Sequence, residues 1–329
     1  MEPISLDNLI DRMCNIKGIT LKYNTYEEVK DYLLNKNNYL RTASYRKNFQ
    51  KYQGGINEGK YINLDFKYLV ELSTIDRKLR NIIIQMCIDI EHKLKINMLK
   101  DIEAKHINSL EITEKFLDNN KSVLNNIERS SSSPHTGNLI KKYFELECKE
   151  DEETNKKRNK IIKYDGCPIW VLVEIVGFGD FIKCYKFCYD EIKEKAPIAE
   201  NILNSIRSIR NCCAHNNCLI NNLHTKKAHA PTIITKFISD IKTIKDKQRK
   251  NKLSCRPILE VVSVLYAYDK LDIKSKELDK LEDLFLYEIP KNKEYFITNE
   301  LLVTQYRFIL EVIKYIKNSW HIFNNRVVF

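Results

Sequence analysis

Apolar residues recur at spacings of three and four along most of this chain, whereas strand-like alternation of apolar and polar residues is sparse. That periodicity is typical of amphipathic helices that bury one face. The clearest stripe belongs to a long helix expected to begin near Asp65, and its apolar positions are Leu72, Ile75, Leu79, Ile82, Ile83, Met86, Ile90 and Leu94. A stripe of this length can form one wall of a helical bundle. The pattern therefore predicts an all-α protein.

Shorter periodic segments lie on both sides of the long helix. They predict helices over residues 27–35 and 64–72, around a polar loop at 53–59, and over residues 258–268, 278–285 and 301–323 towards the C-terminus. Between residues 105 and 165 the periodicity weakens. A loop is expected at 129–137, and the mixed-charge run at 147–160 predicts a solvated helix or a mobile insertion.

These patterns divide the chain into three regions. Residues 1–64 form an N-terminal helical region, residues 65–229 a helical domain with a polar insertion near 105–165, and residues 230–329 a basic, helical C-terminal region. Within the central region, Pro168 suits the first turn of a strongly apolar helix that Gly177 and Gly179 end or bend. Trp170 and Phe178 could stack on bases, but in so apolar a run they are expected in the core.

Residues 205–215 combine an apolar face with an unusual set of polar side chains. The apolar face recurs at helical spacing and consists of Leu203, Ile206, either Ile209 or Arg210, and Cys213. Arg207, Asn211 and His215 lie four residues apart on the other face, and Arg210 lies at the edge of that stripe. An imidazole can move a proton near neutral pH, and a guanidinium can stabilise a pentavalent phosphorane. The segment is therefore a candidate site for phosphodiester chemistry without a metal.

The same residues also fit a plainer interpretation. A helix with Arg207 and Arg210 on a solvated face and one incidental His215 is common, and an arginine five positions before a histidine occurs by chance in many proteins. On spacing alone that interpretation is favoured. Context elsewhere in the chain shifts the balance towards the catalytic one.

The motif at residues 210–215, Arg-Asn-Cys-Cys-Ala-His, resembles the Arg-x-x-x-x-His signature of HEPN domains. It is similar to the form found in the Abi-like family of bacterial abortive-infection proteins, the AbiD/AbiF group. Three further blocks resemble that family in the expected order, and they lie at residues 38–46, at 66–80 continuing to 90–95, and at 168–180. Together the four blocks extend from about Tyr39 to Asn221.

The resemblance implies a HEPN-type helical bundle with N-terminal and C-terminal helical extensions, and a metal-independent endoribonuclease that uses no cofactor. HEPN ribonucleases bring the motif helices of two domains face to face, so a chain with one motif implies a homodimer. His215 would take the proton from a ribose 2′-hydroxyl, Arg210 would stabilise the phosphorane, and Asn211 would orient the phosphate or the imidazole. The products would carry 2′,3′-cyclic phosphate and 5′-hydroxyl ends.

The resemblance also implies partners and a rival function. A growth-arresting ribonuclease toxin of an anti-phage or toxin–antitoxin system would be restrained by a cognate non-coding RNA antitoxin, as in some relatives. The rival is a non-catalytic RNA-binding module that keeps the HEPN scaffold and acts by sequestration. The presence of Arg210, Asn211 and His215 together favours the ribonuclease.

Charge agrees with a polyanionic partner, although charge alone does not identify it. The net charge is +11, and residues 236–256, here called the basic stretch, hold eight basic residues against two acidic ones. With Arg207, the expected RNA-binding residues are Lys245, Lys247, Arg249, Lys250 and Lys252. A solvated helix followed by a loop explains the stretch equally well.

Cysteine usage and hydropathy favour a cytoplasmic protein. The 10 cysteines are expected to remain thiols, and no metal site is expected because the Cys212, Cys213 and Cys218 group lacks a Cys-x-x-Cys knuckle. No apolar run reaches the roughly 20 residues that span a bilayer, and no basic start with an apolar core marks a secretory signal. No membrane partner is expected.

Overall fold

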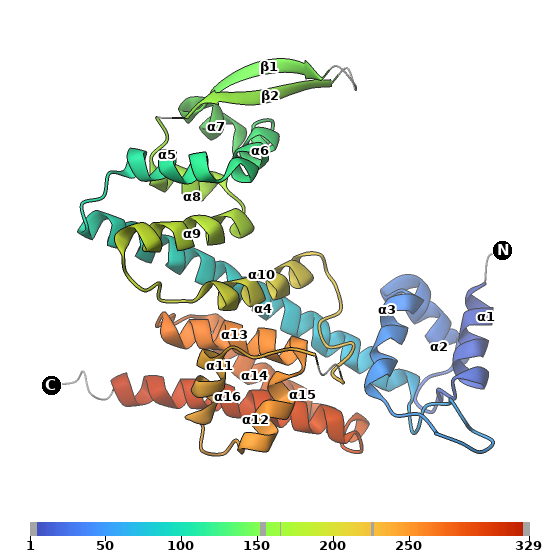
Figure 1. The fold of residues 1–329 in the computed structure, drawn as a ribbon. Coiled ribbons are helices and arrows are strands. Elements are labelled where there is room, and N and C mark those ends of the chain that lie inside the picture. Colours follow the sequence, from blue (N-terminus) through green and yellow to red (C-terminus); the bar gives the residue numbers. More distant parts are fainter. Residues whose placement is uncertain (1–4, 152–155, 165, 225–226, 325–329) are drawn as a thin grey trace. The chain divides into compact units, whose positions relative to one another are not determined.

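The computed structural model describes residues 5–151, 156–164, 166–224 and 227–324. Across these residues the elements are helices apart from one two-stranded sheet, which confirms the all-α class (Figure 1). The chain forms two compact units, unit 1 from residues 1–87 and 208–329 and unit 2 from residues 88–207. Helices α4 (Phe66–Ala104) and α10 (Glu200–Ala214) each continue from one unit into the other. The HEPN-type bundle and the three-region division stay predictions.

The N-terminal part of unit 1 consists of short helices with side-chain caps. Helices α1 (Leu6–Asp11), α2 (Tyr26–Asp31) and α3 (Tyr39–Ser44) each follow a Ser, Thr or Asn whose side chain accepts a backbone N–H of the first turn. Helix α1 continues as a π-helical turn at Arg12–Ile16, α2 as another at Tyr32–Lys36, and α3 as a 3-10 turn at Tyr45–Asn48. The helix predicted over residues 27–35 is confirmed.

Helix α4 carries the long apolar stripe. It is 39 residues long and begins one residue after Asp65, as the periodicity predicts. The stripe residues Leu72, Leu79, Ile83, Met86, Ile90 and Leu94 are buried, whereas Ile75 and Ile82 are half-buried. Burial of such a face stabilises a helix far more than its intrinsic propensity does. The long helix and the nature of its buried face are therefore confirmed.

Unit 2 packs helices against a β-hairpin. After α4 come α5 (Ser109–Asn119), α6 (Lys121–Ser130), α7 (Gly137–Tyr143), strands β1 (Glu145–Asp151) and β2 (Lys156–Lys163), and helices α8 (Ile169–Ile175) and α9 (Phe178–Ile192). The loop predicted at 129–137 is confirmed between α6 and α7. Figure 1 shows the hairpin at one end of this unit.

Of the two alternatives predicted for residues 147–160, the solvated helix is wrong for the described part of that run, and the mobile insertion stays a prediction. Its two halves pair as antiparallel strands, with Glu147 opposite Lys160, so that unlike charges face each other across the ladder. Strand β2 is anchored to α6, because the Glu128 carboxylate accepts the N–H of Ile161 at 3.0 Å and the Ile161 side chain is buried. Residues 152–155 of the predicted run lie outside the described residues.

The apolar helix after Pro168 is confirmed as α8, and Gly177 separates it from α9. Phe178 is buried as predicted, but the prediction that Trp170 lies in the core is wrong, because 54% of its surface is exposed. Helix α8 is only seven residues long and buries Ile169, Val171, Leu172, Val173 and Ile175. Trp170 lies in its first turn, on the side of the helix that this core does not cover.

The C-terminal part of unit 1 is built around one almost fully buried helix. This part comprises α11 (Thr232–Ser239), α12 (Asp246–Leu253), α13 (Arg256–Lys270), α14 (Lys276–Asp283), a π-helical turn (Leu284–Glu288), α15 (Ile289–Lys291), a 3-10 turn (Lys293–Tyr295) and α16 (Glu300–Asn324). Helix α13 is buried from Ile258 to Tyr268, and α16 packs along it (Figure 1). The helices predicted over residues 258–268, 278–285 and 301–323 are confirmed. Across the described residues, no helix combines the length and apolar character that crossing a membrane requires.

Candidate functional site

The motif lies at the C-terminal end of α10, whose opposite face is fixed in the interior. Ile202, Leu203, Ile206 and Ile209 have no exposed surface and Cys213 is buried, so the predicted apolar face is confirmed. A helix held by so many buried apolar side chains presents its other face in a fixed orientation. The polar residues of that face are therefore positioned by the core.

The polar face is open to solvent at Asn211 and His215. Both side chains are exposed, and Arg210 is half-buried with its Nη1 donating to Asn211 Oδ1 at 3.3 Å. The structure therefore brings Arg210 and Asn211 into contact, as a shared site requires. His215 follows the last helical residue, yet its N–H still donates to the Asn211 carbonyl at 3.0 Å, so it continues the final turn.

A Schellman motif ends the helix directly after His215. The Asn217 N–H donates to the Cys212 carbonyl at 2.9 Å and the Asn216 N–H donates to the Cys213 carbonyl at 3.0 Å, while Asn216 has the left-handed φ of +56°. Asparagine tolerates that backbone conformation better than most residues. His215 therefore occupies the C-cap position, where its backbone is fixed on both sides.

A buried ion pair holds the chain after the motif, at residues 216–223, here called the post-motif segment. Asp76 Oδ1 accepts the backbone N–H groups of Leu219 and Ile220, both at 2.8 Å, and Asp76 Oδ2 pairs with Arg80. Arg80 in turn donates to the Asn217 carbonyl at 3.2 Å. Burial raises the pKa of the Asp76 carboxyl. The positive charge of Arg80 and the two N–H groups act in the opposite direction and lower that pKa, without cancelling the effect of burial. We call this pair the Asp76/Arg80 clamp.

Two residues of the N-terminal region also bind the post-motif segment. Arg41 donates to the backbone carbonyl of Asn216 and, at 2.9 Å, to its side-chain oxygen. Asn48 donates to the Ile220 carbonyl and accepts the Leu223 N–H, both at 2.8 Å. Sequence reasoning missed Arg41, Asn48 and Asp76 because each binds a backbone group more than 140 positions away. The four-residue spacing of Asp76 and Arg80 was the one available signal.

Arg207 is positioned separately, within unit 2, by a glycine. Its guanidinium lies against Gly179, where an added Cβ would come within 2.9 Å of Nη1. The Arg207 side chain is exposed and has no ion pair within the described residues. Gly179 therefore does not end the apolar helix, as the sequence predicted, but lies in the first turn of α9, where its missing side chain leaves room for this cation.

The basic stretch divides into residues that reach solvent and residues that do not. Lys245, Lys247 and Lys250 are exposed. Lys250 pairs with Asp246 at 3.1 Å. Arg249 has a largely buried side chain and also pairs with Asp246. The hydrogen bond from Lys250 lowers the pKa of Asp246. Lys252 is buried and donates to Thr304, so its position does not suit contact with a phosphate backbone.

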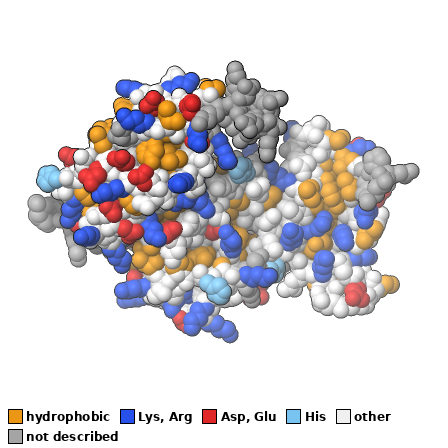
Figure 2. All heavy atoms as spheres, turned by 45° about the horizontal axis from the view of Figure 1, so that its top comes forward, with side chains coloured by type: hydrophobic (Ala, Val, Ile, Leu, Met, Phe, Trp, Pro, Cys, Tyr) orange, Lys and Arg blue, Asp and Glu red, His pale blue; other side chains and the backbone are white. Residues whose placement is uncertain are grey.

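Charges of both signs cover the visible surface. On the face drawn in Figure 2, basic side chains are spread between acidic and apolar ones and do not form one continuous stripe. This face therefore does not single out one basic surface, and individual exposed cations must be tested one cluster at a time.

The cysteines around His215 are structural in character. Burial raises the pKa of Cys213 to about 12 and also raises the pKa of Cys212, so both thiols stay protonated near neutral pH. Within the parts of the chain that the structure describes, no group of three or more His, Cys, Asp and Glu residues has the arrangement of a metal site. His224 and His229, the histidines that follow the motif in the sequence, are both exposed.

One comparison with known proteins matches the region just described. A family model described as Abi-like protein matches residues 32–221. The match includes Arg41, the Asp76/Arg80 clamp and the complete motif, and it excludes the basic stretch. No curated protein and no solved structure matches the chain.

Replacing Asp76 with Ala should destabilise unit 1 and release the post-motif segment. The Arg80 guanidinium would lose its buried counter-ion, and the N–H groups of Leu219 and Ile220 would lose their acceptor. Breaking a buried pair in this way lowers the free energy of unfolding by about 3–5 kcal/mol. Denaturant unfolding measures that loss, and hydrogen–deuterium exchange should show faster exchange at Leu219 and Ile220.

Glu111→Ala is the matched control, because Glu111 pairs with Lys115 at 2.7 Å with the same four-residue spacing on an exposed helix face. Exposed pairs contribute little to stability. An Asp76→Ala variant as stable as this control, with unchanged exchange at Leu219, would contradict the clamp.

Proposed function

The chain belongs to the Abi-like protein family, and on that premise we propose that it is a metal-independent endoribonuclease of abortive infection. Family membership suggests the role in abortive infection. The ribonuclease activity is proposed from the motif at residues 210–215 and from the way in which unit 1 holds it.

The observation that carries the proposal is that the motif side chains are exposed while the backbone that carries them is held in place. Asn211 and His215 are open to solvent, and Arg210 contacts Asn211. The backbone at His215 is held by the Schellman motif, and the post-motif segment that follows is held by the Asp76/Arg80 clamp. A catalytic group works best when its position is set before the substrate arrives. A solvated helix end without function needs no buried ion pair to order the residues that follow it.

The proposed chemistry divides between the three side chains. Neutral His215 accepts the proton of a ribose 2′-hydroxyl, and the resulting oxyanion attacks the adjacent phosphorus. Arg210 stabilises the charge of the phosphorane, and Asn211 orients the scissile phosphate or the imidazole. The bond from phosphorus to the 5′-oxygen then breaks, and that oxygen is protonated by a second His215 or by water. The ends formed are a 2′,3′-cyclic phosphate and a 5′-hydroxyl.

The proposed active form is a homodimer with two motifs facing each other. One chain carries a single motif, so the second histidine has to come from a second copy. Ala214 is exposed between Cys213 and His215, and its small side chain permits close approach of a partner helix. The contact would be isologous, with each motif facing its own copy.

Two RNA partners are proposed, a substrate and a cognate non-coding RNA antitoxin that restrains the enzyme. The cations proposed to contact phosphates are the exposed Lys245, Lys247 and Lys250 and, separately in unit 2, the exposed Arg207. Lys252 is left out because it is buried, and Arg249 because its largely buried side chain pairs with Asp246. A non-catalytic RNA-binding module that works by sequestration is the second function to test. The half-buried Arg210 in contact with Asn211 favours catalysis, because backbone binding alone does not require an oriented guanidinium.

His215→Ala and Arg210→Ala should each reduce RNA cleavage by at least about a hundredfold, the usual contribution of a general base or of an oxyanion-stabilising group. Folding and RNA binding should persist, because both side chains reach solvent. Cleavage is measured on end-labelled RNA with and without chelator, and end analysis identifies the cyclic phosphate. A 2′-deoxy substitution at the cut site should abolish cleavage.

His135→Ala and Arg129→Ala serve as controls, since both residues are exposed and lie outside the motif. Full activity of either motif variant would refute the assignment. Loss of activity in chelator that zinc or magnesium restores would point to metal-dependent chemistry. RNA binding by the wild type with no cleavage would favour the sequestration function.

Ala214→Arg should convert a dimer into a monomer of 39.0 kDa and abolish cleavage, because the added side chain and charge lie where the partner helix approaches. Light scattering coupled to gel filtration measures the molar mass. Ala104→Arg is the control, since Ala104 is exposed at the end of helix α4. A wild-type protein that is monomeric and active would contradict the composite site.

Replacing Lys245, Lys247 and Lys250 together with Gln should weaken binding of a long regulatory RNA and flatten its salt dependence. Removing one cation that binds a phosphate lowers the slope of log affinity against log salt by about 0.7 for single strands, so removing three lowers it by about 2. Turnover of a short oligonucleotide should be unchanged. A triple variant of the exposed Lys121, Lys186 and Lys195 matches the charge change. An equal effect of both triple variants would show that the basic stretch contributes only net charge.

A further inference from the structure

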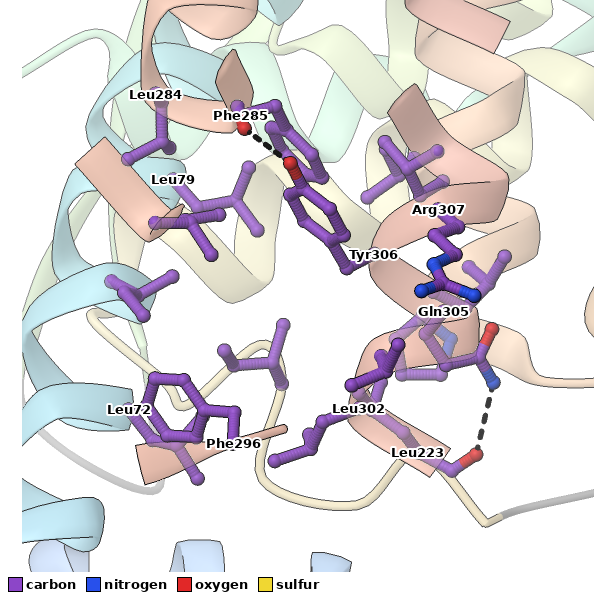
Figure 3. Close-up of a pocket in the computed structure, with 18 of the residues that line it drawn as sticks. Leu72, Leu79, Leu223, Leu284, Phe285, Phe296, Leu302, Gln305, Tyr306 and Arg307 are labelled. Atoms are coloured by element: carbon purple, nitrogen blue, oxygen red, sulfur yellow. Dashed lines mark hydrogen bonds between the residues drawn. The ribbon is translucent and has the colours of Figure 1, made fainter. Parts of the chain in front are cut away.

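Unit 1 contains a cavity of about 310 Å³ with walls that are almost entirely apolar. Figure 3 shows its lining side chains, with Leu72 and Leu79 of α4 on one side and Leu302 and Tyr306 of α16 on another. The Tyr306 hydroxyl donates to the Phe285 carbonyl at 2.7 Å, and the two rings stack with centroids 5.6 Å apart. The polar end of Tyr306 is thus already satisfied.

Three polar groups that line the cavity lack a partner among the described residues: the charged ends of two basic side chains and one amide oxygen. Lys293 and Arg307 line it with exposed side chains, and neither has an ion pair or side-chain hydrogen bond within the described residues. Gln305 is buried and lines it too, with Nε2 donating to the Leu223 carbonyl at 3.4 Å and Oε1 lacking any hydrogen-bond partner among the described residues. A protein interior of ordinary packing does not leave such a space beside a buried orphan acceptor.

These features define the chemistry of an occupant. The volume lies at the lower end of the roughly 300–1,000 Å³ range of small-molecule sites. Apolar walls exclude nucleotides and sugars, whose polar groups would find no partners there. The two cations at exposed positions of the lining select an anionic group that stays in water while the rest of the molecule is buried.

We propose that the cavity binds a medium-chain carboxylate, with the alkyl chain among the apolar walls and the carboxylate beside Lys293 and Arg307. An alkyl chain fills a narrow apolar space without polar groups to desolvate, and its carboxylate supplies the negative charge that these two side chains can pair with. The buried Gln305 Oε1 gives the interior a place for one water molecule or for a hydroxyl on the chain.

The ligand would act on the post-motif segment. Leu219, Ile220 and Leu223 line the cavity, and the backbone N–H groups of the first two bind Asp76. Ile75 and Leu79, which flank Asp76 along α4, line it as well. Occupation of the cavity thus tightens packing around the Asp76/Arg80 clamp. This link rests on unit 1 alone and does not depend on the proposed ribonuclease.

The first experiment is a chain-length series with hexanoate, octanoate and decanoate, each below its micelle concentration, measured by titration calorimetry on the full chain. Each buried methylene should tighten binding about fourfold, from the transfer free energy of one methylene group. The melting temperature should rise in the same order. Hydrogen exchange in the presence of decanoate should slow at Leu219 and Ile220.

Variants then separate the two parts of the site. A Lys293→Gln/Arg307→Gln double variant should bind decanoate roughly threefold to tenfold more weakly, as expected for two exposed charge pairs, and should bind decanol as the wild type does. Val303→Phe, at a half-buried lining position, should fill the cavity and abolish binding of both. Lys276→Gln/Lys280→Gln matches the charge change at exposed positions outside the cavity.

Several outcomes would overturn the proposal. Affinity that does not change with chain length, or no binding of any member of the series, would show that the cavity takes no alkyl chain. Equal binding of decanol and decanoate, unaffected by the double variant, would exclude the anionic class. Cavity residues that gain protection when the protein self-associates, with no binding of decanoate, would identify a segment of a second copy as the occupant.

Discussion

The hydrogen bonds from the post-motif segment to Asp76 are the interaction on which the candidate site depends. They join a carboxylate on α4 to backbone amides 143 and 144 positions later, and the Arg80 charge makes the buried carboxylate tolerable. Without them, residues 216–223 would keep only their apolar contacts and the bonds to Arg41 and Asn48, and more backbone entropy would oppose one conformation. With them, the helix end that carries His215 has a rigid continuation, and the walls of the apolar cavity meet the same backbone.

The helices could be predicted from the sequence because their information is local. The stripe of α4, the apolar face of α10 and the three C-terminal helices all follow from spacings of three and four, and each was confirmed. The hairpin at residues 145–163 could not be predicted in this way, because its strands are charged and depend on each other and on Glu128. The exposure of Trp170 could not be predicted either, because it depends on which neighbours cover the seven-residue helix α8.

Part of the candidate site could be predicted from the sequence, again because the information is local. The motif lies within one helix, so its stripe of Arg207, Asn211 and His215 follows from spacing alone. Arg41, Asn48 and Asp76 all bind backbone atoms of the post-motif segment, and a pattern of side chains in the sequence does not indicate a backbone partner. Exposure of individual lysines was also beyond the sequence: Lys250 and Lys252 are two positions apart, yet one reaches solvent and the other donates to Thr304.

The discontinuity of unit 1 has a consequence for the growing polypeptide on the ribosome. Unit 1 joins residues 1–87 to residues 208–329. Asn299, just before α16, donates to the Asn48 carbonyl, and Gln305 of α16 donates to the Leu223 carbonyl. Domains that fold during synthesis do so as their residues emerge from the exit tunnel. Asn299 and Gln305, which bind the backbone of Asn48 and of Leu223, thus emerge only when translation is almost finished. Nascent chains and fragments that end before residue 299 therefore lack the contacts that tie the C-terminal part of unit 1 to Asn48 and to the post-motif segment.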